Sequence, residues 1–147
     1  MGISDKLFEM KNQKAEANLK EGEKFLEENG KKPGVVVLAS GLQYEIITEG
    51  TGPKPTAKDK VTCHYHGTLI DGTVFDQTDP GQSATFPTGA LIPGWVEALQ
   101  MMKEGDEWEL VIPSALGYGE EGAGEGAIPG GQTLVFDMTL LTVEDEE

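Results

Sequence analysis

The hydrophobic pattern of the chain changes near residue 34. Residues 4 to 29 contain no proline, are rich in Lys, Glu, Ala and Leu, and repeat apolar side chains at helical intervals. Ser4 is suited to cap the start of a helix, and Asn29-Gly30 is a typical helix end. The apolar stripe consists of Phe8, Ala15, Leu19 and Leu26. The pattern therefore predicts a helix of about 25 residues.

This stripe contains few apolar residues, and two interpretations of its role remain. Asn12 and Gly22 occupy two positions where a continuous apolar seam would need hydrophobic side chains. A strong coiled coil is therefore not expected, and packing on the chain's own domain and dimerisation both remain as alternatives. The run Lys31-Lys32-Pro33-Gly34 breaks the helix. We divide the chain into an N-terminal helix with its linker, 1–34, and one compact domain, 35–147.

Beyond the linker, apolar and polar residues alternate over short runs, which is typical of β-strands. Val61, Cys63, Tyr65 and Leu69 should share one face of their strand. Asp71-Gly72 is a hairpin signal, so the run after it should pair antiparallel with the run before it. Glycine and proline punctuate residues 49 to 60, which predicts a loop. We expect strands over residues 35–38, 42–48, 61–69, 73–75, 107–112 and 133–143.

One short helix is available to cover the inner faces of these strands. It follows Pro93, where apolar residues recur at helical spacing over about two turns. The repeat consists of Trp95, Ala98, Leu99 and Met102, and the facing residues of the last two strands are Trp108, Leu110, Ile112, Leu134, Phe136, Met138 and Leu140. Because no strand–helix–strand alternation recurs, the pattern predicts an α+β domain with an antiparallel sheet.

The composition narrows the range of partners. Eleven Lys, no Arg and 26 acidic residues give a net charge of -15. This charge repels phosphate backbones and anionic lipid surfaces, so we expect neither a nucleic acid nor a membrane partner. Its simplest interpretation is solubility, with a basic client as the alternative. Cys63 is the one cysteine, and no segment in the first 30 residues resembles a signal peptide. We expect a cytoplasmic location, or a periplasmic one if Met1-Gly2 replaces a removed signal.

The glycine-rich stretch from residue 117 to 131 is not expected to bind phosphate. It contains seven glycines in fifteen residues, but no Lys follows them and no long helix begins after them. Its acidic residues, which would repel an anion, are Glu120, Glu121 and Glu125. A tightly turned or flexible binding loop fits the stretch better.

Neither a metal site nor a covalent nucleophile is expected. On a strand, Cys63 points away from His64 and His66, which leaves the two histidines without a third ligand. Ser83 and Ser114 lie in no nucleophile motif, and Cys63 belongs to the buried face. No cofactor is implied by any motif in the chain.

A group of aromatic and aliphatic residues near loops indicates a small-ligand site. Each of them alone is more often part of a core, because apolar residues mostly lie inside. The group consists of Tyr65, Phe75, Leu91, Ile92, Trp95, Tyr118, Ile128 and Phe136. Asp76 directly follows Phe75, and a carboxylate there needs solvent or a donor such as a tyrosine hydroxyl. Apolar walls with few polar groups are typical of a site for a small ligand.

Six motifs in order resemble those of FKBP-type prolyl isomerases over about residues 36 to 145. They are His64-Tyr65-His66-Gly67, Asp71-Gly72 with Val74-Phe75-Asp76, Ile92-Pro93-Gly94-Trp95, Leu116-Gly117-Tyr118-Gly119, Ile128-Pro129 and Leu134-Val135-Phe136-Asp137. The Ser40-Gly41-Leu42-Gln43-Tyr44 segment and the preceding helix are similar to the bacterial branch related to macrophage infectivity potentiators. The N-terminal regions of that branch often dimerise, so a homodimer is an expectation of this resemblance.

The resemblance implies an antiparallel half-barrel wrapped around one short helix, with a substrate prolyl ring resting on Trp95. The implied catalytic positions are Tyr65, Phe75, Asp76, Ile92, Trp95, Tyr118 and Phe136, and the implied substrate-binding positions are Leu91, Ile128, Phe86 and Ala127. Tyr118 would donate a hydrogen bond to a substrate carbonyl. Two departures weaken the expectation of macrolide binding: Ala84 replaces a frequent pocket aromatic, and Asp76 lacks its frequent basic partner.

The expected function is acceleration of X-Pro rotation in peptides and folding proteins. Uncatalysed rotation has a barrier of roughly 18–20 kcal/mol and transfers no proton, so desolvation and stabilisation of the twisted amide suffice without a covalent step. A prolyl-segment-binding chaperone or scaffold with incidental turnover is the main alternative. A macrolide-binding protein and a purely structural domain are two others.

Overall fold

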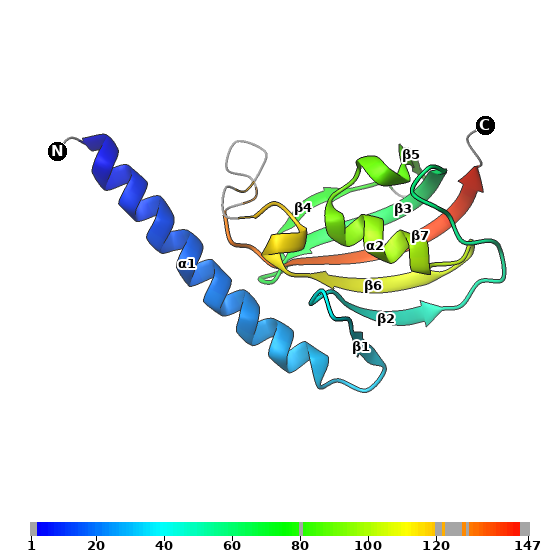
Figure 1. The fold of residues 1–147 in the computed structure, drawn as a ribbon, viewed down its shortest axis with the longest axis horizontal. Coiled ribbons are helices and arrows are strands. Elements are labelled where there is room, and N and C mark those ends of the chain that lie inside the picture. Colours follow the sequence, from blue (N-terminus) through cyan, green and yellow to red (C-terminus); the bar gives the residue numbers. More distant parts are fainter. Residues whose placement is uncertain (1–2, 80, 120–121, 123–127, 129, 145–147) are drawn as a thin grey trace.

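A long helix precedes a curved antiparallel sheet that wraps around a short helix (Figure 1). The computed structural model describes residues 3–79, 81–119, 122, 128 and 130–144. The helices are α1 (Ile3–Gly30) and α2 (Pro93–Met101), with 3-10 turns η1 (Thr88–Ala90) and η2 (Ser114–Leu116). The strands are β1 (Val35–Val37), β2 (Gln43–Thr48), β3 (Lys60–Leu69), β4 (Val74–Gln77), β5 (Ala84–Pro87), β6 (Glu107–Ile112) and β7 (Leu134–Glu144). The predicted α+β half-barrel is confirmed.

The sheet is organised around β3. Its strands follow the order β1-β2-β6-β7-β3-β4, and every pairing is antiparallel. Strand β3 pairs with β7 along its length, with β5 at its beginning and with β4 towards its end. The return of the chain after Asp71-Gly72, predicted from the hairpin signal, is confirmed by β4. Three later segments of the chain therefore converge on β3.

Strand β5 is absent from the sequence prediction. It is four residues long and ends in Pro87, which leaves too short a run for period-two alternation to be recognised. Its register places Phe86 opposite Val61. Its strand conformation is thus stabilised by pairing with β3 more than by its own residues.

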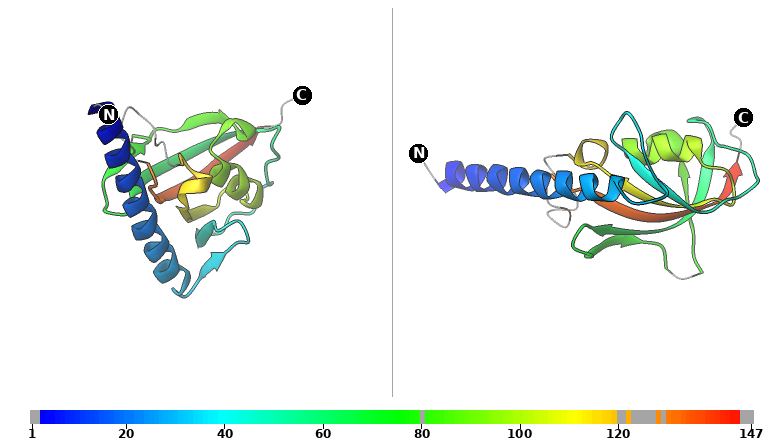
Figure 2. Two further views of the ribbon diagram at one scale, coloured as in Figure 1. Left: turned by 60° about the vertical axis from the view of Figure 1, so that its left-hand side comes forward. Right: turned by 90° about the horizontal axis from the view of Figure 1, so that it is seen from below.

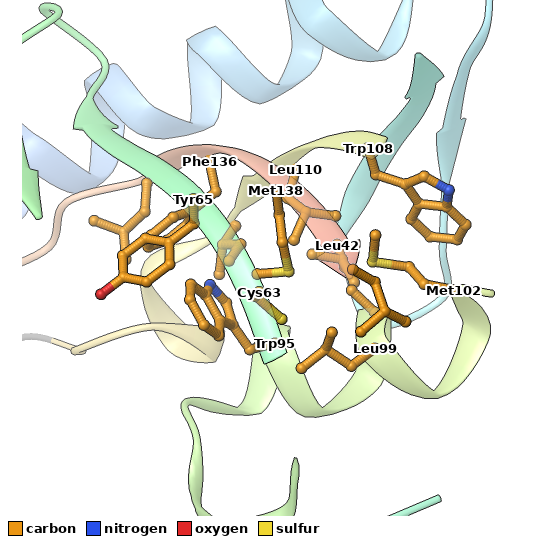
Figure 3. Packing of buried hydrophobic residues seen from close by; sticks show 14 of the residues in the cluster. Leu42, Cys63, Tyr65, Trp95, Leu99, Met102, Trp108, Leu110, Phe136 and Met138 are labelled. Atoms are coloured by element: carbon orange, nitrogen blue, oxygen red, sulfur yellow. The ribbon is translucent and has the colours of Figure 1, made fainter. Parts of the chain in front are cut away.

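The core lies between the sheet and α2 (Figure 3). The predicted inner face of β3 is buried, and so is the predicted helical face of α2. Leu99 and Met102 are fully buried in the same cluster as Leu110 of β6 and Met138 of β7. Cys63 is also fully buried, and this burial raises the pKa of its thiol to about 12. The thiol is therefore neutral at physiological pH and acts as a core residue.

The C-terminal half of α1 packs on the domain. Asn29 Nδ2 donates to Gln43 Oε1 at 2.8 Å, and Gln43 Nε2 donates to the Leu26 carbonyl at 2.8 Å. Gly22 is buried, and a Cβ at this position would overlap the Thr133 side chain. Gly22, interpreted above as a gap in an apolar seam, therefore permits close approach of helix and domain.

A further contact ties α1 to the glycine-rich loop. Asn18 Nδ2 donates to the Gly130 carbonyl at 2.9 Å.

The N-terminal half of α1 continues beyond the sheet (Figure 2). In the described part of the chain, no helix combines the length and apolar character that crossing a bilayer requires. The packing interpretation thus holds for the second half of α1, and dimerisation stays a prediction.

Candidate functional site

A cavity of about 140 Å³ opens beside α2, between the sheet and the loops that follow η1 and η2. Residues from all these segments line it: Tyr65, Asp76, Phe86, Leu91, Ile92, Trp95, Tyr118 and Phe136. Every one of them was predicted as a site residue from the sequence. Five of these residues lie on strands or on α2, and the other three, Leu91, Ile92 and Tyr118, lie on loops.

The floor of the cavity is an aromatic cluster centred on Trp95. The first turn of α2 positions this indole, whose side chain is 5% exposed. Tyr65, Phe86 and Phe136 all meet it edge to face, with centroids 5.0, 5.8 and 5.1 Å away. Such geometry matches the preferred arrangement of aromatic quadrupoles. Trp95 Nε1 is buried and has no hydrogen-bond partner among the described residues, so the indole presents carbon atoms to the cavity.

Two other predicted site residues, Phe75 and Ile128, are described by the structure but do not line the cavity. Phe75 packs edge to face on Phe136, with ring centroids 5.5 Å apart, and supports the wall from behind. Ile128 is buried in the core cluster. Ala127 lies outside the described residues.

Gly67 is a position that sequence reasoning did not assign to the site. A Cβ there would lie 2.6 Å from Phe136 Cε1 and 3.0 Å from Phe75 Cζ. Only glycine lets both rings lie over β3 at this point. The sequence did carry an indication of this role, because Gly67 falls on the inner face that the alternation of β3 predicts.

The rim of the cavity carries two phenols and one carboxylate. Tyr65 Oη donates to Asp76 Oδ2 at 3.0 Å, which provides the tyrosine partner expected for this carboxylate. Burial and then the Asp76 hydrogen bond raise the pKa of Tyr65 to about 12. Burial and then the Asp76 charge also raise the pKa of Tyr118. Both phenols are therefore neutral hydrogen-bond donors at physiological pH.

The Tyr65 pKa gives a direct test of this rim. We expect Tyr65 to ionise near pH 12 in a spectrophotometric titration, and Asp76→Asn to lower that midpoint while burial keeps it above 10. Because the folded pKa exceeds the unfolded value, the stability contributed by neutral Tyr65 is complete below pH 10 and declines between about pH 10 and 12. An unchanged midpoint in Asp76→Asn would contradict the coupling.

Thr78 fixes the segment after β4 to β3 and was not predicted. Its hydroxyl oxygen accepts from the Tyr65 N–H at 3.0 Å, and its own N–H donates to the Tyr65 carbonyl at 2.9 Å. The same hydroxyl lies 2.5 Å from His64 Nδ1. His64 thus takes part in a structural network. Separately, no group of three potential metal ligands is found among the described residues.

Apart from the buried Trp95 Nε1, two hydrogen-bond donors at the cavity have no protein partner in the described part of the chain. They are the Tyr118 hydroxyl and the Ile92 N–H, which precedes α2. The Ile92 carbonyl, by contrast, accepts from the N–H groups of Trp95 and Val96. An apolar cavity with two available donors can hold a ring and a neighbouring carbonyl group.

Comparisons with known proteins agree with this geometry. The family model for FKBP-type peptidyl-prolyl cis-trans isomerase matches residues 52–141, and the model for the domain amino terminal to it matches residues 1–46. The "Outer membrane protein MIP" of Legionella longbeachae is 52% identical over 134 residues, which cover 90% of this chain and 57% of that protein. The "FKBP-type 22 kDa peptidyl-prolyl cis-trans isomerase" of Escherichia coli is 48% identical over 142 residues, which cover 96% and 68%.

Solved structures show the same similarity. A peptidyl-prolyl cis-trans isomerase from Pseudomonas syringae superposes with a TM-score of 0.83 at 44% identity, covering 88% of this chain and 96% of that one. FkpA from Escherichia coli superposes with a TM-score of 0.88 at 38% identity, covering 92% and 63%. The chain spans 57% of the Legionella relative and 47% of the FkpA relative from Aeromonas hydrophila.

Proposed function

This chain belongs to the FKBP-type peptidyl-prolyl cis-trans isomerase family, and from that premise we propose that it accelerates X-Pro bond rotation in peptides and folding proteins. The aromatic-floored cavity carries the proposal. Its volume is about 140 Å³. An apolar cavity of about 150 Å³ can hold a benzene molecule, so a five-membered prolyl ring fits a space of this size.

Desolvation supplies the first part of the mechanism. A planar amide is polarised by conjugation, and its twisted form has less charge separation. Transfer into a cavity formed by Trp95, Phe136 and Phe86 therefore costs the planar ground state more than the transition state. Lowering the barrier by about 5 kcal/mol would accelerate rotation several-thousandfold. No bond is formed or broken with the protein.

Hydrogen bonds supply the second part. We assign the Tyr118 hydroxyl and the Ile92 N–H as donors to substrate carbonyl groups in the rotated form, because both face no protein acceptor in the described structure. Asp76 holds Tyr65 in place through their hydrogen bond. Leu91 and Phe86 contact the substrate at the cavity edge. Phe75 and Ile128 support the wall from the core.

The cis-to-trans rate of a short leucyl-prolyl peptide tests this function. We expect the purified chain to accelerate it, and Tyr118→Phe to lower kcat/KM roughly tenfold through the loss of one hydrogen bond. Tyr44→Phe is the matched control, because Tyr44 stacks on Trp108 and does not line the cavity. Absence of acceleration by folded wild-type protein, or equal losses in both variants, would reject the proposal.

A prolyl-segment-binding chaperone is the second candidate, favoured by the half of α1 that extends beyond the sheet. In that case Tyr118→Phe would slow peptide turnover but leave suppression of client aggregation unchanged. Parallel loss of both activities would favour the isomerase alone.

The cellular location of the chain is also proposed from its sequence. Cys63 favours a reducing compartment, so we retain the cytoplasm as first proposal and the periplasm as alternative, which cell fractionation distinguishes. Homodimerisation through α1 is testable by sedimentation. Macrolide affinity is expected to be reduced for two reasons. Ala84 replaces a frequent pocket aromatic, and Asp76 lacks its frequent basic partner.

A further inference from the structure

A second concave site lies at the junction between α1 and the sheet, with no residue in common with the prolyl cavity. It is an open groove of about 600 Å³. Its residues come from the end of α1, the following turn, strands β1 and β2 with their connection, and the residue after β6: Glu23, Leu26, Glu27, Gly30, Lys31, Val37, Ser40, Gly41, Gln43 and Pro113. Figure 1 shows these segments meeting where α1 approaches β1.

The groove has apolar walls that remain exposed to solvent. Leu26 and Pro113 are partly buried, and Val37 is 53% exposed. Val36 next to it is 42% exposed but does not line the groove, because successive side chains of β1 point to opposite faces. The polar floor is already satisfied, because Gln43 exchanges hydrogen bonds with Asn29 and Leu26. The apolar surface of Leu26, Val37 and Pro113 beside a satisfied floor favours apolar side chains as ligands.

The charge around the groove is negative. Glu23 and Glu27 are one helical turn apart on α1, a spacing at which like charges repel. The one cation of the lining, Lys31, lies 3.7 Å from Glu27 with both side chains more than 70% exposed, so their pairing is weak. Glu97 adds a third carboxylate, which accepts from Ser40 Oγ at 2.5 Å. A cationic ligand would relieve this repulsion.

We propose that this groove binds extended polypeptide segments in which an apolar side chain is flanked by Lys or Arg. The apolar residue packs on Leu26, Val37 and Pro113, and the flanking cations face Glu23 and Glu27. The site needs no proline and does not depend on isomerase activity. It would give the chain a second contact with a client chain, which raises avidity without any change in the prolyl cavity.

The test uses a fluorescein-labelled heptapeptide of alternating lysine and leucine, without proline, followed by fluorescence anisotropy on the full chain. We expect saturable micromolar binding. The variant Glu23→Lys with Glu27→Lys should weaken it at least tenfold. Glu16→Lys with Glu21→Lys is the matched control, because both residues are exposed on the same helix, lie outside the groove and change the net charge equally. The control should weaken binding less than about threefold.

A second pair of variants tests the apolar wall. Val37→Ser should weaken binding about fivefold, since burial of the valine side chain is lost. Leu141→Ser, an exposed apolar residue elsewhere on the sheet, should leave affinity unchanged. Circular dichroism checks folding, and Glu23→Gln with Glu27→Gln replaces the reversal variant if that variant fails to fold.

Three outcomes would overturn the proposal: no binding at millimolar peptide, equal weakening by both double charge reversals, or equal effects of the two serine variants. Excess prolyl peptide should not displace the probe. Because probe binding is measured without turnover, it remains readable if the isomerase proposal fails.

Discussion

Alanine in place of Phe136 is expected to lower the free energy of unfolding by about 3–5 kcal/mol and to remove most isomerase activity. Phe136 is 2% exposed and its ring contacts the rings of Tyr65, Phe75 and Trp95. Its loss creates a buried void and opens the wall of the prolyl cavity at once. Urea denaturation measures the first effect, and the leucyl-prolyl assay in conditions where the variant is folded measures the second.

Leu140→Ala separates these two effects. Leu140 is fully buried on the same strand and the same face as Phe136, but it does not line the cavity. Its truncation should cost about 2–5 kcal/mol of stability and leave kcat/KM within about twofold of wild type for the folded protein. Equal kcat/KM in folded Phe136→Ala and Leu140→Ala would remove Phe136 from the proposed mechanism.

The second large effect is expected for Gly67→Ala. The added Cβ would lie 2.6 Å from Phe136 Cε1, and the ring also packs edge to face with Trp95, with centroids 5.1 Å apart. Overpacking of this kind typically costs about 1–3 kcal/mol. The displaced ring narrows the cavity, so kcat/KM should fall about tenfold, equivalent to about 1.4 kcal/mol in the barrier.

A double variant tests this explanation. Leucine at position 136 is smaller near Gly67, so Gly67→Ala with Phe136→Leu should be more stable than the sum of the single losses predicts. Thermal unfolding of the four proteins gives the coupling. Strict additivity, or a Gly67→Ala protein with wild-type stability and rate, would show that the contact does not restrict the ring.

The fold was largely predictable because its long strands carry complete alternation. Strand β6 has three inner residues in six positions, and its bounds agree with the prediction. Strand β5 was missed because four residues ending in Pro87 carry too little pattern, and its conformation depends on pairing with β3. Local periodicity reports burial on one face, and it does not report which distant segment provides the partner strand.

The residues themselves indicated a small-ligand site, but the roles of its individual members were predictable only through the family resemblance. Phe136 and Met138 both lie on the inner face of β7 and are both buried. Alternation cannot tell which of them borders a cavity, because that depends on where α2 begins over the sheet. Thr78 was missed for a related reason: its hydrogen bonds to Tyr65 arise from the path of the chain after β4, for which the sequence carries no motif.

The close fit of Gly22 against Thr133 also fixes the position of the N-terminal end of α1 relative to the domain. A 28-residue helix measures about 42 Å, and the contacts at Asn18, Gly22 and Asn29 fix both its direction and its rotation. Each residue inserted before Asn18 would shift the N-terminal end by about 1.5 Å and rotate it by about 100°. The N-terminal end of α1 is thereby held at a defined distance and angle from the prolyl cavity.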